Sequence, residues 1–132
     1  MDAAATVRAF WAAMGSNDWD AAARHLAPDY RGLWPQSGEV IEGPAAFAAL
    51  QTAFPGQGSW QFEEIALVVD GARVVTDMRV TNPALDVTAR AITFHALSGA
   101  LILQQTEFWP DPYPAPDWRR GLTRRDAQAA RY

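Results

Sequence analysis

Apolar residues recur with a helical period in the first third of the chain. The first stripe has four residues at positions i, i+3, i+4 and i+7, the pattern of one helix face: Val7, Phe10, Trp11 and Met14. Gly15 and Ser16 end this helix, and Asn17 or Asp18 can cap a second, shorter one. Pro28 ends the second helix, because the residue before a proline avoids helical angles. Its apolar face comprises Trp19, Ala22, Ala23 and Leu26.

Two short strands and a third helix are predicted next. Residues 30–34 and 38–43 can each form a short strand. Gly43-Pro44 then opens a helix, since proline is favoured at the first helical position, and Pro55-Gly56 stops it. The buried stripe of this helix is Phe47, Leu50 and Phe54.

The remainder of the chain has the pattern of β-strands. Four strand-like segments follow one another at 59–70, 72–82, 85–97 and 100–109. Three turn signals separate them, and the first is a strong hairpin signal: Asp70-Gly71, Asn82-Pro83 and Ser98-Gly99. Long strands joined by short turns predict an antiparallel meander. The fold class is therefore α+β, with the helices on one face of a curved sheet.

Composition and charge narrow the function classes. The chain of 132 residues is one domain's worth. It has no cysteine, which excludes disulfides and thiolate metal sites and fits a cytoplasmic location. Residues 1–117 carry 6 Arg against 14 Asp and Glu, a balance of −8, whereas 118–132 carry 5 Arg against Asp126, a balance of +4. An acidic body argues against nucleic acid as a partner. We expect the basic tail to fold against the body or a neighbouring subunit.

Membrane partners are not expected either. The N-terminus lacks the basic and apolar regions of a secretory signal, and no apolar run approaches the roughly 20 residues of a membrane helix.

Three segments, in this order, carry a resemblance to a known family. They read VRAFWAAMGSNDWDAAARHLAPDY at 7–30, WPQSGEVIEGPAAF at 34–47 and SGALILQQTEFWPDPYPAPDWR at 98–119. Together they resemble the SnoaL-like branch of the nuclear-transport-factor-2-like (NTF2-like) superfamily. The resemblance covers about residues 4–120 and implies an NTF2-like cone, in which three helices and a curved, mostly antiparallel sheet enclose an apolar cavity. We place this domain at residues 1–120 and a basic tail at 121–132. It also implies a homodimer formed through the outer sheet face.

Ketosteroid isomerases of this fold use a tyrosine and two aspartates, and this sequence matches none of the three. Phe10 stands at the tyrosine position, Trp34 before Pro35 at that of the catalytic base, and Thr93 near that of the second aspartate. Phe10 has no hydroxyl group and an indole cannot take up a proton. A steroid-isomerase mechanism is therefore not expected.

The polyketide-cyclase branch resembles this chain at its last strand, where Glu107 matches an acid that donates a proton inside the cavity. Apolar neighbours would raise the pKa of an inward Glu107 and make it a usable acid or base. Strand alternation groups Leu103, Gln105, Glu107 and Trp109. It likewise groups Ala89, Ala91, Thr93, His95 and Leu97. A three-residue turn would bring the two faces together, whereas a two-residue turn would separate His95 from Glu107.

Each candidate residue has a structural alternative. Glu107 could instead pair with an arginine such as Arg90, and His95 could be a core histidine rather than a helper in proton transfer. Residues 33–40 are expected to form the cavity rim, with Glu39 at the surface. The predicted ligand-binding residues are Phe10, Trp34, Gln36, Thr93, Gln105 and Trp109.

Three functions remain open on this sequence, and neither a metal nor a cofactor is expected, because two distant histidines give no metal-ligand spacing. The first is cofactor-free acid/base catalysis on an apolar small molecule. The second is binding of such a molecule without catalysis. The third is a structural dimer with a filled cavity.

Overall fold

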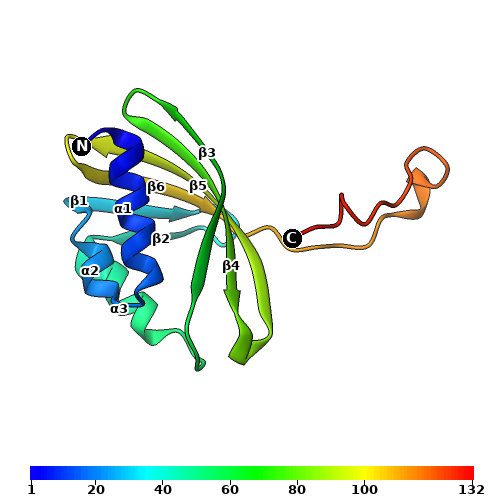
Figure 1. Cartoon of the computed structure of the whole chain (residues 1–132), viewed down its shortest axis with the longest axis horizontal. Helices are drawn as coiled ribbons and strands as arrows, with labels where there is room; N and C mark the ends of the chain where they lie inside the picture. The colour runs from blue at the N-terminus through cyan, green and yellow to red at the C-terminus, as the bar shows by residue number, and fades with distance from the viewer.

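Three helices lie together on one side of a curved sheet in the computed structural model, which describes residues 1–132 (Figure 1). They are α1 (Ala3–Gly15), α2 (Trp19–Ala23) and α3 (Pro44–Ala53). Asp2 and Asp18 cap the first two, accepting hydrogen bonds from the backbone N–H of Ala5 at 2.7 Å and of Ala21 at 3.0 Å. Each cap occupies an N–H group that the helix itself leaves unpaired.

The six strands form one mixed sheet. Their bounds are β1 Leu26–Trp34, β2 Glu39–Glu42, β3 Gln61–Asp70, β4 Arg73–Asn82, β5 Val87–Ser98 and β6 Leu101–Phe108. The order across the sheet is β2-β1-β6-β5-β4-β3, and only β1 and β6 pair in parallel. The predicted α+β class and the meander of four strands are confirmed. Two 3₁₀ turns, Pro83–Leu85 and Asp117–Arg119, complete the elements.

The first strand begins earlier than predicted. Leu26 belongs to β1 rather than to the second helix, which ends at Ala23. Pro28 lies inside β1, where the pairing with β6 is irregular between Leu26 and Arg31. A proline has no N–H group to give to a ladder, so it is tolerated where the ladder is interrupted. Pairing with β6, including the hydrogen bond from Ile102 N–H to the His25 carbonyl (2.8 Å), therefore outweighs the local helical pattern.

A bulge sets the orientation of β6. The turn between β5 and β6 has only two residues, since Ser98 pairs with Leu101. Leu97 then pairs with Ile102 but Ala96 pairs with Gln104, which leaves Leu103 as an additional residue. An extra residue turns every later side chain to the opposite face. Ile102, not Leu103, thus occupies the inner position and is 0 % exposed.

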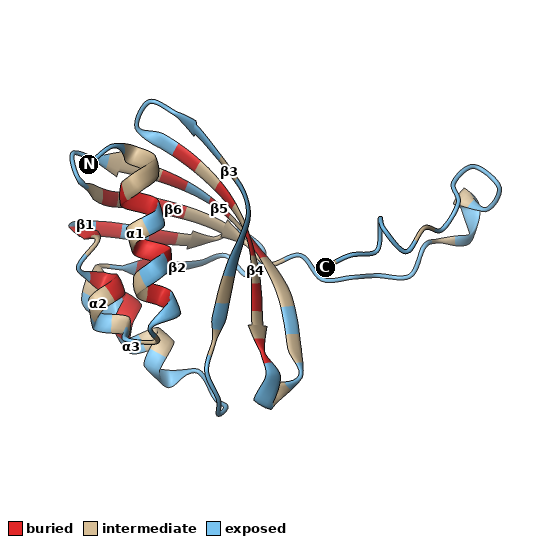
Figure 2. Ribbon diagram, viewed as in Figure 1, coloured by how far each residue is buried: buried red, intermediate tan, exposed pale blue.

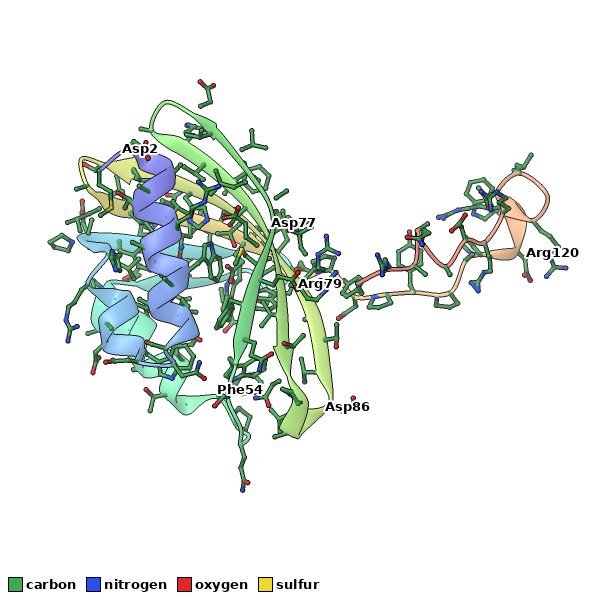
Figure 3. The ribbon with its side chains drawn as sticks, viewed as in Figure 1. Asp2, Phe54, Asp77, Arg79, Asp86 and Arg120 are labelled. Atoms are coloured by element: carbon green, nitrogen blue, oxygen red, sulfur yellow. The ribbon has the colours of Figure 1, made fainter.

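The core lies between the helices and the concave face of the sheet, where Figure 2 shows the buried stripes. The predicted face of α1 is buried as a whole: Val7, Phe10, Trp11 and Met14. Arg90 pairs with Asp77 on the other face of the sheet, with Nη2 and Oδ2 2.6 Å apart. Figure 3 shows Asp77 and Arg79 on this outer side, away from the helices.

The chain after β6 leaves the body as an extended segment and returns at its end (Figure 1). Its large apolar residues Tyr113, Trp118 and Leu122 are exposed. The last residue lies against the outer sheet face, where the Arg79 guanidinium donates to the Tyr132 carbonyl at 2.7 Å. The predicted boundary between a domain at 1–120 and a tail at 121–132 stays a prediction.

Two glycines with similar backbone angles provide a test of the segment that joins α3 to β3. Gly58 has φ +87, and a Cβ added there would lie 2.6 Å from both Ala84 Cβ and Asn82 Oδ1; Gly38 has φ +80 and nothing within 4 Å. We expect Gly38→Ala to cost about 1 kcal/mol of the free energy of unfolding through backbone strain alone. Gly58→Ala should cost about 1–3 kcal/mol more, because the added methyl group overpacks its neighbours. Urea denaturation measures both, and equal losses would contradict the predicted crowding.

Candidate functional site

A cavity of about 620 Å³ lies between the helices and the concave sheet face. Of the 22 residues that line it, 17 are hydrophobic. Ten are aromatic, from all three helices or their ends and from the sheet: Phe10, Trp11, Trp19, Tyr30, Trp34, Phe47, Phe54, Trp60, Phe62 and Trp109. A concave apolar cavity of this size is typical of a small-molecule site.

Aromatic pairs hold the walls in place. Phe10 on α1 contacts Phe47 on α3 with ring centroids 5.9 Å apart, and Tyr30 on β1 meets the same Phe47 ring edge-on at 6.0 Å. Phe54, labelled in Figure 3, directly follows α3 and is 51% exposed, so it does not belong to a buried stripe as predicted. Its ring packs edge-on against Trp60 at 5.1 Å. Such pairs stabilise by about 0.5–1.5 kcal/mol beyond the burial of their area, so the walls are rigid where the rings interlock.

Glu107 is the only charged residue that lines the cavity. Its Oε2 accepts a hydrogen bond from Thr93 Oγ1 at 2.6 Å, and its Oε1 accepts one from Trp109 Nε1 at 2.9 Å. Burial raises the pKa of Glu107, and hydrogen bonding by Thr93, Trp109 and Trp34 lowers it by a smaller amount. The carboxyl group is therefore a stronger proton acceptor than an ordinary glutamate, yet it remains open to a ligand.

The β5–β6 register explains why Glu107 faces inward. Thr93 pairs with Glu107 and His95 with Gln105, so all four lie on the inner face although the turn has two residues. The two-residue turn alone would have separated them, and the additional Leu103 restores the match. Glu107 has no ion pair with Arg90, whose guanidinium pairs with Asp77.

A chain of hydrogen bonds links side chains that line the cavity to buried side chains of the sheet. Tyr30 OH donates to Gln105 Oε1 (2.7 Å), and Gln105 Nε2 donates to His95 Nδ1 (3.1 Å). His95 Nε2 lies 2.8 Å from Thr76 Oγ1, which also accepts from Trp11 Nε1 at 3.2 Å. An amide N–H can only donate, so His95 Nδ1 must accept and its proton sits on Nε2. A second proton, on Nδ1, would point at the N–H donor of the Gln105 amide, and the hydrogen bond between them would be lost.

His95 and Tyr30 are both kept neutral by burial. Burial lowers the pKa of His95 to about 3. Burial, and to a smaller extent the nearby Glu107 charge, raises the pKa of Tyr30. Neither group is poised to exchange a proton near neutral pH. The prediction that His95 assists proton transfer stays a prediction; in the structure its Nδ1 accepts a hydrogen bond from the Gln105 amide.

Five of the predicted site residues line the cavity: Phe10, Trp34, Gln105, Glu107 and Trp109. Thr93 lies behind Glu107 as its hydrogen-bond donor. Gln36 is exposed on the turn between β1 and β2, where its side chain accepts from Trp109 N–H (2.6 Å) and donates to the Trp109 carbonyl (3.3 Å). Gln36 thus fastens the end of β6 to the rim, and its predicted contact with a ligand remains a prediction. Glu39 is exposed, at the start of β2.

Sequence reasoning missed Tyr30, which brings a phenol to the cavity wall. Strand alternation could have found it, because Tyr30, Gly32 and Trp34 lie on the same face of β1 and all line the cavity. Gly32 leaves room there, since a Cβ at this position would lie 2.6 Å from the Tyr30 hydroxyl oxygen. No cluster of three or more histidine, cysteine, aspartate or glutamate residues is present that would hold a metal ion. None of the helices has the length and apolar character needed to cross a membrane.

Known proteins of similar sequence or structure share this fold. The family model described as "SnoaL-like domain" matches residues 7–104. A candidate ketosteroid isomerase from Kribbella flavida is similar in structure, with a TM-score of 0.82 and 28% identity over 92% of this chain and 87% of that one. An NTF2-like protein of unknown function from Burkholderia xenovorans has a TM-score of 0.76 and 24% identity, covering 95% of both chains.

A candidate SnoaL-like polyketide cyclase from Jannaschia has a TM-score of 0.69 and 20% identity, covering 81% of this chain and 84% of the other. None of the curated proteins compared with the sequence matches it. The structural likenesses confirm the predicted NTF2-like cone, with three helices on a curved sheet of six strands.

The neutral His95 predicts a specific acid sensitivity. Its pKa is about 3 in the folded chain against an ordinary value of 6.5, so the unfolded chain binds a proton that the folded one does not. Stability from this group is complete above pH 6.5 and falls as the pH drops toward 3, by at most about 1.4 kcal/mol per pH unit. We expect His95→Gln to flatten the fall in unfolding free energy between pH 6 and 4, measured by urea denaturation.

His25→Gln is the control for this measurement and should leave the slope of the wild-type chain unchanged. In the wild-type chain, the His95 ring should show no titration by NMR between pH 5 and 8. A ring that takes up a proton in that range would contradict the neutral assignment.

Proposed function

The chain belongs to the SnoaL-like domain family, and we propose that it binds an apolar small molecule in the cavity and that Glu107 moves a proton on it without a cofactor. One observation carries the proposal: the only charged group lining an aromatic cavity is a carboxyl group whose pKa burial raises. A catalytic acid or base works best when its pKa lies near the operating pH, and burial shifts a glutamate in that direction.

The hydrogen bonds of Glu107 suit a general base. One carboxylate oxygen accepts a bond from Thr93 and the other accepts one from Trp109, and Trp34 is a third partner of the group. An ionised carboxylate has about four acceptor sites, so capacity is left for a ligand. Thr93 and Trp109 hold the carboxylate in one orientation at the cavity. The Glu107 carboxylate could serve as the base that removes a proton from a carbon next to a carbonyl group, the kind of step that isomerases and cyclases of the family catalyse.

A second candidate, binding without catalysis, has its own observation. The polar groups near Glu107 are already engaged: the Tyr30 hydroxyl donates to Gln105 and the Gln105 amide donates to His95. Of these groups only the second amide N–H of Gln105 has no acceptor in the protein, so few donors are left to stabilise the negative charge that develops on a substrate oxygen. Such stabilisation usually provides a large part of catalysis. A chain with this cavity and no turnover would act as a carrier or sensor of an apolar metabolite.

We propose in addition that the chain is a homodimer in the cytoplasm, joined through the outer sheet face. This face carries Phe94, which is 49% exposed and packs edge-on against Phe108 with centroids 6.3 Å apart. Val68 is also exposed and lies two strands away on the same face, where Val75 pairs with both Val68 and Phe94. Exposed aromatic pairs on a sheet face favour burial against a partner. The absence of cysteine leaves the fold independent of an oxidising compartment.

Substitution of Glu107 tests the proposed chemistry. Native mass spectrometry of the purified chain, beside a denatured sample, should first identify a small molecule that co-purifies with it. In D₂O the wild-type chain should then exchange a carbon-bound proton of that compound for deuterium, measured by NMR. Glu107→Gln keeps the size of the side chain and removes the base, so we expect exchange to fall by about 100-fold or more while binding persists.

Glu39→Gln is the matched control, because Glu39 is an exposed carboxyl group on the rim of the same fold. It should exchange at the wild-type rate. Binding by the wild-type chain without any Glu107-dependent exchange would reject catalysis and leave the binding function.

The dimer is tested by two substitutions at equal exposure. Phe94 and Val69 are each 49% exposed, but Val69 pairs with the buried Val74 and so lies on the inner face. We expect Phe94→Glu to convert the dimer to a monomer in sedimentation equilibrium, since it places a charge in an apolar contact. Val69→Glu should leave the mass unchanged. A monomeric wild-type chain would contradict the proposal.

A further inference from the structure

We propose that the ligand of this cavity carries a positively charged amine, seated against Glu107 with its apolar body among the aromatic side chains. The inference rests on the ligand-binding part of the proposed function and is independent of whether Glu107 also moves a proton. It assigns a charge to the ligand class, which the family likeness leaves open.

The charge distribution around the cavity is the first argument. No arginine or histidine is among the residues that line it, and the chain contains no lysine. The nearest arginine on β5, Arg90, is engaged in a two-bond pair with Asp77 at 2.6 and 2.8 Å on the other face of the sheet. An ionised carboxylate among apolar side chains is costly unless an opposite charge accompanies it. Nothing in the chain provides that charge, and a cationic ligand would.

The hydrogen-bonding capacity of the site points the same way. Trp109 Nε1–H and Thr93 O–H are engaged by Glu107, and Tyr30 O–H by Gln105. What Glu107 offers the cavity is acceptor capacity, because an ionised carboxylate has about four acceptor sites and its partners Thr93, Trp109 and Trp34 do not fill them all. An ammonium group presents donors and a positive charge at once. A ligand carboxylate or phosphate would instead meet a like charge.

The aromatic lining is the third argument. Aromatic side chains make up ten of the 22 lining residues, and five of these are tryptophans: Trp11, Trp19, Trp34, Trp60 and Trp109. The face of an indole attracts a cation within about 6 Å of its centre, more strongly than the other aromatic rings do. An aliphatic cavity of equal volume would bind a neutral apolar molecule as well, but only an aromatic one favours a cation beside the carboxylate.

A set of ligands that share one apolar body separates charge from shape. Calorimetric titration at pH 7 compares 2-naphthylmethylamine, which is protonated there, with 2-naphthalenemethanol and with 2-naphthoate. We expect the amine to bind the wild-type chain at least about tenfold more tightly than the alcohol, and the carboxylate to bind least. In Glu107→Gln the preference for the amine over the alcohol should disappear while the alcohol binds as before.

The control variant Glu39→Gln should keep the wild-type order, and circular dichroism checks that each variant is folded. The comparison within the wild-type chain needs no variant at all. Equal or tighter binding of the alcohol would overturn the inference and leave the cavity's ligand-binding function intact. An amine preference that persists in Glu107→Gln would overturn it as well. Failure of all three compounds to bind would reject this ligand class, and the co-purification and exchange experiment above would still judge the proposed function separately.

Discussion

The additional residue at Leu103 determines which side chains of β6 reach the cavity. A two-residue turn with regular pairing would set His95 opposite Gln104 and Thr93 opposite Thr106, and it would send Glu107 to the outer face. The bulge shifts the register by one residue, so Gln105 and Glu107 point inward with Ile102. On its other side, β6 pairs with β1 across the irregular stretch that holds Pro28. Both neighbours of β6 thus accommodate the same distortion near residues 102–104, and the only charged group of the cavity depends on it.

A network of hydrogen bonds holds several polar side chains in the cavity wall and behind it, and Glu107 is the one charged group that faces the cavity. Tyr30, Gln105, His95, Thr76 and Trp11 form a continuous chain of hydrogen bonds. A buried polar group without a partner costs about 1–3 kcal/mol, so this arrangement holds His95 in one tautomer and Gln105 in one orientation. The buried oxygen of the Asn82 side chain has no such partner, and it lies away from this chain, beside Gly58. The hydrogen-bonded side chains support the sheet side of the cavity, and the Glu107 carboxyl group keeps acceptor capacity toward it.

Local patterns in the sequence predicted the elements, and long-range pairing decided what the patterns left open. The stripe of α1 and the Asp70-Gly71 hairpin follow from spacing and turn chemistry, which act over a few residues. The extent of β1 does not follow from local patterns. Leu26 fits the helical stripe and Pro28 reads as a helix end, and only the pairing with β6 places both in a strand. The Leu103 bulge has no sequence signal of its own, which is why both orientations of Glu107 stayed open. Tyr30 could have been placed by alternation from Trp34, whereas the clamp of Gln36 on the Trp109 backbone depends on a contact across 73 residues.

Two proteins that share this fold need not catalyse the same reaction, because their polar groups can lie on different helices and strands. The candidate ketosteroid isomerase shares 28% identity and the same scaffold. The resemblance places the residues of that reaction on the first helix, after the first strand and on a later strand, where this chain has Phe10, Trp34 and Thr93. Here the phenol comes from β1, through Tyr30, and the carboxyl group from β6, through Glu107. These two strands are neighbours and pair in parallel, so the phenol and the carboxyl group reach the cavity from adjacent strands. Any chemistry assigned to this cavity has to be argued from the groups that line it, among which Glu107 is the only charged one.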